Sequence, residues 1–149
     1  MPGFKQAFVQ PLDQISATEL DHVGDIQWRG SRAYKYVKYV GQLPGVSGDC
    51  VRYTEGGYAT YEVDADKNEG MAAGILQTNC VDGDYIWIQI KGLASVTWNL
   101  PGNPGDTLVV DDDTDGEMIL LSVVGDSDRQ VAAYVADIIS DVITCDFPF

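Results

Sequence analysis

The stretch from Asp82 to Asn99 constrains the fold most strongly, because its apolar residues alternate over two adjacent runs. Within residues 85–91 three isoleucines alternate with aromatic and polar side chains, and a period of two is typical of a pleated strand. Gly92 interrupts the run, and residues 94–99 then alternate again. This pattern predicts two strands, with the second pairing back against the first around Gly92.

The two faces of the first run predict different environments. Ile86, Ile88 and Ile90 share one face, which should belong to the core of a domain. Tyr85 and Trp87 share the other face, and we expect both rings to pack under a neighbouring segment of the chain or under another subunit.

Further strands are expected where short β-branched and aromatic runs lie between turn residues. Their ranges are 25–28, 33–40, 50–53, 58–63, 71–76, 108–110 and 118–124. Gly74 within one of these runs indicates a bulge or a close approach of the backbone. Residues 130–147 fit either a helical stripe or two strands joined at Ser140 and Asp141. We favour the strands, because a closing hairpin would protect a sheet edge.

The sequence therefore predicts a mainly β protein. Residues 25–149 should form a single small β-barrel or β-sandwich of about nine to eleven short strands. Residues 1–24 carry no sustained period and should form an extended N-terminal arm. Ser16 and Glu19 have the spacing of a capping box, which predicts a short helical turn over residues 15–20.

The arm contains apolar side chains without a complete face to pack on. They are Phe4, Phe8, Val9 and Leu12. Exposing them would be costly, so the arm should lie on its own domain or on a neighbouring subunit. The sequence leaves both alternatives open, and it makes these four residues candidates for contact with another subunit.

The net charge of −14, from 23 acidic and 9 basic residues, argues against binding to nucleic acid or to an anionic membrane. A small basic and aromatic cluster stands out on this background. It comprises Arg29, Arg32, Lys35, Lys38, Tyr34 and Tyr36. These side chains could contact an acidic partner surface or a neighbouring subunit, or pair with the chain's own carboxylates.

Cys50, Cys80 and Cys145 lie far apart and match no zinc-binding spacing, so we expect reduced thiols that are at least partly buried. The first residues lack the apolar core of a signal peptide, and no run is long enough for a membrane helix. We therefore expect a protein that is soluble and is not secreted.

No catalytic constellation is apparent, and no cofactor is expected. The lone His22 is not accompanied by a recognisable nucleophile motif. Asp111, Asp113 and Asp115 match the opening of a calcium loop, but position 12 is Ser122 where a bidentate Glu is needed. These aspartates are a weak calcium candidate, and a polar hairpin tip explains them as well. The sequence thus favours a non-enzymatic protein.

Four features carry a resemblance to a known family. They are the arm leading to GDIQWRGSRAYKYVK at 24–38, the short strands separated by glycines, the run GDYIWIQIKG at 83–92 and the closing run from VVGDSD at 123–149. Together, and over residues 23–149, the chain resembles the head-decoration or cement proteins of tailed bacteriophages. The acidic run DDDTDGE departs from the pattern and leaves open a metal-dependent variant.

The resemblance implies a virion structural protein that binds the outer surface of an assembled capsid and stabilises the shell. Its partners would be the major capsid protein and further copies of itself, and it would be soluble in the host cytoplasm before assembly. A second hypothesis is a carbohydrate-binding β-sandwich, with or without the assistance of calcium, with Tyr85 and Trp87 as its binding face. A carboxylate hydrolase is a third, because acidic residues are plentiful.

Overall fold

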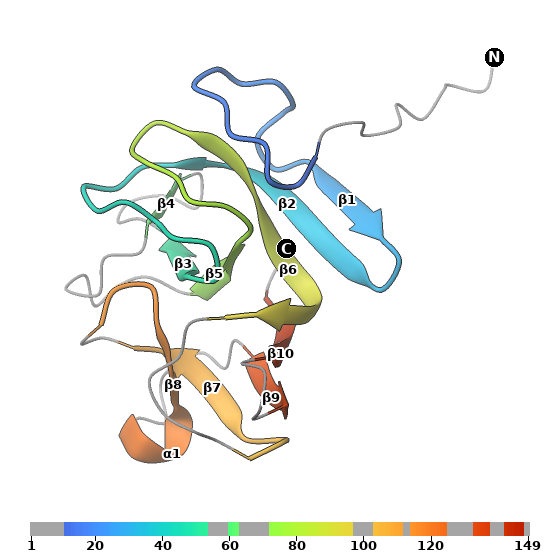
Figure 1. Ribbon diagram of the computed structural model, residues 1–149, viewed down its shortest axis with the longest axis vertical. Coiled ribbons are helices and arrows are strands. Elements are labelled where there is room, and N and C mark those ends of the chain that lie inside the picture. Colours follow the sequence, from blue (N-terminus) through green and yellow to red (C-terminus); the bar gives the residue numbers. More distant parts are fainter. Residues whose placement is uncertain are drawn as a thin grey trace.

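The computed structural model describes residues 11–53, 60–62, 72–96, 103–111, 114–124, 133–137 and 142–147. It is mainly β, as the sequence predicted (Figure 1). The strands are β1 (Ile26–Arg29), β2 (Arg32–Tyr39), β3 (Cys50–Tyr53), β4 (Thr60–Glu62), β5 (Ala72–Leu76), β6 (Tyr85–Ser95), β7 (Thr107–Val110), β8 (Met118–Leu120), β9 (Ala133–Asp137) and β10 (Val142–Asp146), and one helical turn, α1, covers Leu121–Val124.

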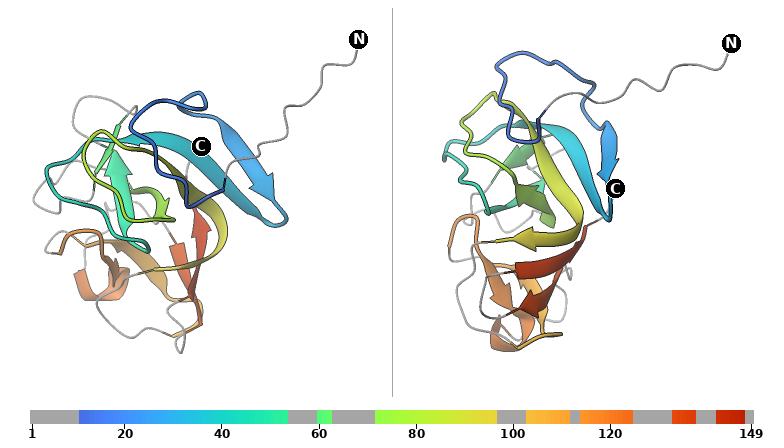
Figure 2. Two further views of the ribbon diagram at one scale, coloured as in Figure 1. Left: turned by 45° about the horizontal axis from the view of Figure 1, so that its top comes forward. Right: turned by 45° about the vertical axis from the view of Figure 1, so that its right-hand side comes forward.

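The strands follow the order β1-β2-β4-β3-β5-β6-β10-β9-β7-β8, with an additional pairing of β2 with β6. All described pairs are antiparallel except β2 with β4. The sheet is not closed, because β1 and β8 stand at its two ends. β1 to β5 lie toward one end of the molecule and β7 to β10 toward the other, with β6 extending between them (Figures 1 and 2).

The prediction of a turn at Gly92 is wrong, because β6 runs through this residue as one strand. Gly92 has φ +90°, which bends the strand without reversing it. Before the bend β6 pairs with β2, and after it with β10. Gln89 stabilises the bend, since its Nε2 donates to the carbonyls of Lys91 at 3.0 Å and Leu93 at 2.9 Å.

Two further local predictions are also wrong. The strand expected over 118–124 ends at Leu120, where the β7–β8 ladder also ends, and residues 121–124 turn into α1. A helical turn lets backbone groups without a ladder partner bond locally. The turn expected over 15–20 is absent: Ser16 bridges Tyr85 instead, and Glu19 accepts from the backbone of Val23.

Other predictions are confirmed. The stretch 130–147 contains the strands β9 and β10, which pair with each other. Gly74 marks a close approach, because a Cβ there would lie 2.8 Å from Ile88 Cδ1 and 2.9 Å from the Gln89 carbonyl oxygen. The three cysteines are free and buried. None of the helices in the described ranges has the length and apolarity to cross a membrane.

The core has two parts on opposite faces of β2 and β6. The larger part is formed by alternate residues of the two strands, including Val37 on β2 and the isoleucines of β6. These isoleucines are fully buried, as predicted. Ala94 and Val96 continue the same face beyond Gly92. The smaller part, on the other face, is formed by Tyr34, Tyr36 and Trp87. We call these three residues the outer aromatic cluster.

Candidate functional site

The described part of the arm, residues 11–24, lies on its own domain. Ser16 and Tyr85 exchange two backbone hydrogen bonds of 3.2 and 2.8 Å. The Tyr36 hydroxyl accepts from the backbone of Leu20 at 3.2 Å, and the Tyr36 carbonyl accepts from Gly24 at 2.8 Å. These bonds fasten the arm to the outer face of β2 and β6. Phe4, Phe8 and Val9 lie outside the described residues.

Leu12 covers the outer aromatic cluster together with Tyr85. Tyr36 lies 5.1 Å from Trp87 and 6.2 Å from Tyr85, measured between ring centroids. The side chains of Tyr34 and Tyr36 are therefore buried within the chain itself and are not at its surface. Burial also raises the pKa of the Tyr36 hydroxyl.

Trp87 cannot act as the sugar-binding face of the second hypothesis. Its exposed fraction is 0%, and it packs under the arm side of the sheet, as the alternation of residues 85–91 predicted. Tyr85 is half-buried beside it. A sugar ring stacks only on an accessible aromatic ring. Tyr85 and Trp87 therefore do not form the carbohydrate-binding face that the second hypothesis requires.

The arm and β1 carry a run of exposed apolar side chains. Ile15, Leu20 and Val23 in the arm and Trp28 in β1 are 46%, 45%, 38% and 57% exposed. We call these four side chains the arm surface. Only Val46, Val81 and Leu93 are comparably exposed large apolar residues elsewhere in the described ranges. The sequence does not predict this set, because an aperiodic segment does not reveal which of its residues face outward.

The basic residues of the predicted cluster lie on both faces of β2 and do not form one patch. Lys35 lies on the side of the larger core with its Nζ 5.7 Å from the centroid of the Tyr53 ring, and burial lowers its pKa. Lys38 points to the opposite face, 5.5 Å from the Tyr85 ring. Arg29 and Arg32 are exposed and stand opposite each other across the β1–β2 ladder.

The acidic turn between β7 and β8 is packed against β3. Asp111 is buried, and its backbone carbonyl accepts a hydrogen bond from Arg52 Nη2 at 2.6 Å. The Gly116 carbonyl accepts one from the backbone N–H of Cys50 at 2.7 Å. Asp115 is exposed, and Asp113 lies outside the described residues. No group of three or more potential metal ligands occurs within the described ranges. Here the turn has a packing role.

Glu117 belongs to the same turn and lies in an acidic environment. Partial burial raises the pKa of its carboxyl group, and the nearby charges of Asp111 and Asp49 raise it further. Asp49 packs directly on Gly116, where an added Cβ would lie 2.6 Å from Asp49 Cγ. The turn therefore holds like charges close together.

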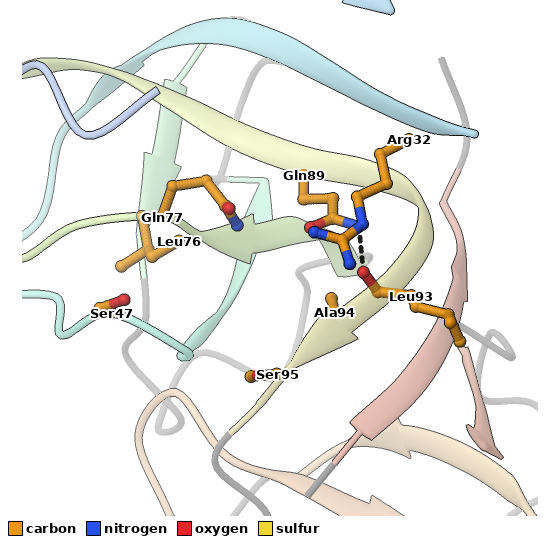
Figure 3. A pocket seen from close by; sticks show the side chains of 8 residues that line it. All are labelled: Arg32, Ser47, Leu76, Gln77, Gln89, Leu93, Ala94 and Ser95. Atoms are coloured by element: carbon orange, nitrogen blue, oxygen red, sulfur yellow. Dashed lines mark hydrogen bonds between the residues drawn. The ribbon is translucent and has the colours of Figure 1, made fainter. Parts of the chain in front are cut away.

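A cleft of about 350 Å³ opens beside the bend of β6 (Figure 3). Its polar lining residues are Arg32, Ser47, Gln77, Gln89 and Ser95, and its apolar ones are Leu76, Leu93 and Ala94. They come from β2, the loop before β3, the end of β5 and β6. Sequence reasoning singled out only Arg32 for a surface role, because no motif links residues from such distant segments.

Comparison of the chain with protein-family models gives no match, and comparison with curated proteins finds none that is significantly similar.

Proposed function

We propose that this protein is a non-enzymatic capsid decoration protein of a tailed bacteriophage, which binds the outside of an assembled shell and stabilises it. The observation that carries the proposal is the arm surface. Four of the seven exposed large apolar side chains of the described ranges fall between residues 15 and 28. Exposed apolar side chains gathered in one segment are typical of a contact site for another protein.

The way the arm is held supports this role. The bonds to Tyr85 and Tyr36 fix residues 16–24 on the sheet before any partner is present. A contact segment that is ordered in advance loses less conformational entropy when it binds. In this proposal the arm surface contacts the major capsid protein or the next copy of the decoration protein.

The charge supports it as well. A net charge of −14 keeps free copies apart in the host cytoplasm and disfavours nucleic acid. Many identical weak contacts on a shell can then add up through multivalency. We also propose that β2 to β6 form a small barrel, because β2 pairs with both β4 and β6.

The test uses shells assembled from the major capsid protein of the phage that, on this proposal, encodes this chain, in unexpanded and expanded form. The full chain should co-sediment with expanded shells. A variant with Ile15→Ser, Leu20→Ser and Val23→Ser should lose most of this binding. These side chains are exposed, so the variant should remain folded, which circular dichroism checks.

The control variant carries Val46→Ser and Val81→Ser, which remove apolar side chains of 52% and 57% exposure elsewhere on the surface. This control should bind shells like the unmodified chain. A full chain that does not bind either form of shell would contradict the proposed function. Equal binding by the arm variant would contradict the role of the arm surface.

A further inference from the structure

We infer that the cleft beside the bend of β6 binds a carboxylate group of a peptide segment, an Asp or Glu side chain, with Arg32 as the residue that recognises the charge. The chemistry of this ligand follows from the cleft itself. Its source, an acidic segment of the shell protein, rests on the proposed function.

Arg32 is the first reason. It lines the cleft, and no hydrogen bond, ion pair or ring contact joins its side chain to another residue in the part of the chain that the structure describes. The other Lys and Arg side chains there differ: Lys35 and Lys38 lie over tyrosine rings, and Arg29, Arg52 and Lys91 also interact with other groups. This protein has a net charge of −14, and an unengaged guanidinium in a cleft provides a local site that attracts an anion.

The floor of the cleft is the second reason. Gln89 is 2% exposed, and both hydrogen atoms of its amide are directed to the carbonyls of Lys91 and Leu93. Gln77 likewise donates to the Ile75 carbonyl at 3.0 Å. These bonds fix both amides, and each side-chain oxygen can then accept from a ligand. A peptide segment supplies suitable donors through its backbone N–H groups.

The apolar wall is the third reason. Leu76, Leu93 and Ala94 line the cleft beside its polar groups. Figure 3 shows Arg32 and Gln89 close to the bend of β6, with the Leu93 side chain pointing away from them, so that Leu76 and Ala94 supply the apolar side chains of the wall. The methylene groups of a Glu side chain can lie on such a wall while its carboxylate reaches the guanidinium. A phosphate has no apolar part to match it, and its larger charge would be repelled more strongly by the whole protein.

Arg32 is also held in place by the fold. Gly92 has φ +90°, and a Cβ on it would lie 2.8 Å from the Ser31 carbonyl oxygen and 3.0 Å from Arg32 Cγ. The bend of β6 therefore packs directly against the start of β2. The same bend brings Ala94 to the cleft, so that one backbone feature positions both the guanidinium and part of the apolar wall of the site.

The first experiment titrates the isotope-labelled full chain with acetyl-Gly-Glu-Gly-amide, with acetyl-Gly-Gln-Gly-amide as the uncharged control, and follows amide chemical shifts. The Glu peptide should shift signals of residues 89–95, and the Gln peptide should not. Arg32→Gln should weaken binding of the Glu peptide by about tenfold, the usual range for losing a charge-assisted hydrogen bond. Arg32→Lys should restore part of the binding, because it keeps the charge but not the planar fork.

Arg29→Gln is the matched control. It removes the same charge at the position directly opposite Arg32 in the β1–β2 ladder, and it should leave binding of the Glu peptide nearly unchanged. Arg32→Gln keeps Cβ and Cγ, on which Gly92 packs, so it should fold. Equal losses in Arg29→Gln and Arg32→Gln, or no shift with the Glu peptide, would overturn the inference.

The second experiment measures co-sedimentation of the same variants with expanded shells. Weaker shell binding by Arg32→Gln than by Arg29→Gln would support the shell as the source of the carboxylate. If the unmodified chain does not bind shells, the proposed function is contradicted. The peptide titration still tests whether the cleft binds a carboxylate. If shells bind both variants equally, the shell is overturned as the source.

Discussion

Tyr36 and Trp87 stand directly opposite each other in the β2–β6 ladder, with ring centroids 5.1 Å apart and ring planes at 51°. Tyr36 also holds the arm, since its hydroxyl accepts a hydrogen bond from the backbone N–H of Leu20 and its carbonyl accepts one from that of Gly24. One cross-strand pair thus joins β2, β6 and the arm. The arrangement makes this pair the support for the arm surface.

Trp87→Ala should therefore be strongly destabilising. Replacing a fully buried Trp by Ala typically costs about 3–5 kcal/mol of unfolding free energy. Urea unfolding followed by circular dichroism measures this loss. Trp28→Ala is the control, because Trp28 is 57% exposed and its removal should cost less than about 0.5 kcal/mol. Similar losses in both variants would contradict the placement of Trp87 in the outer aromatic cluster.

Gly92→Ala should destabilise the protein by more than about 2 kcal/mol, because the new side chain meets both an unfavourable φ and a crowded space. Its Cβ would lie 2.8 Å from the Ser31 carbonyl oxygen. Gly24→Ala separates the two causes, since Gly24 has φ +97° and nothing within 4 Å of an added Cβ. The excess cost at Gly92, read from the two unfolding curves, measures the contact between β6 and the β1–β2 turn. An equal cost at both positions would show that the contact is unimportant.

The buried thiols should make stability fall at alkaline pH. Burial raises the pKa of Cys50 to about 12, from an ordinary value of 9.0. The unfolded chain releases this proton above pH 9.0, but the folded chain retains it, so stability is full below pH 9.0 and declines as the pH rises toward about 12. The decline is about 1.4 kcal/mol per pH unit for a fully buried thiol.

Cys50→Ala isolates this effect from the titration of other groups. Its unfolding free energy, measured by urea titration at several pH values, should fall less steeply above pH 9.0 than that of the unmodified chain. Identical slopes would show that Cys50 does not titrate differently in the two states. The native thiols of Cys50, Cys80 and Cys145, all buried, should also resist alkylation until urea unfolds the protein.

Glu117→Gln should raise the melting temperature at neutral pH. Folding raises the pKa of Glu117 above its ordinary value of 4.5, so the folded state favours the protonated carboxyl group. The stability that this proton contributes is lost as the pH rises through the folded pKa. Glutamine keeps the uncharged form at every pH. The gain should therefore shrink as the solution is acidified toward the pKa of Glu117.

Thermal melts of both proteins across acidic to neutral pH test this prediction. Asp82→Asn removes a charge from an exposed turn position before β6 and controls for the general reduction of negative charge. A gain of equal size from Asp82→Asn would attribute the effect to net charge. The repulsion within the β7–β8 turn would then be unimportant.

Alternation in the sequence was enough to predict the faces of β6, because side-chain direction in a strand depends on parity alone. The isoleucines, Trp87, Ala94 and Val96 all lie where that rule puts them. The partner of the second half of β6 was not predictable in this way. Gly92 favours either a turn or a bend, and the choice depends on β10, which lies about fifty residues further along the chain.

The candidate surfaces were predicted less well for the same reason. Tyr34 and Tyr36 were correctly recognised as unusual, but only the structure shows that the chain's own arm covers them. The cleft depends on residues from four separate segments, and their proximity is a property of topology. A sequence read one segment at a time contains local preferences but not these distant contacts.

The division of β6 between two partners has a consequence for synthesis of the chain. The first half of β6 pairs with β2, which is synthesised earlier. Its second half pairs with residues 142–146, which are synthesised later. Until residues 142–146 emerge, Lys91 to Ser95 present an unpaired strand edge of the kind that promotes aggregation. Nascent chains of this protein should therefore depend on chaperone binding at that stage, and premature termination between β6 and β10 should give insoluble products.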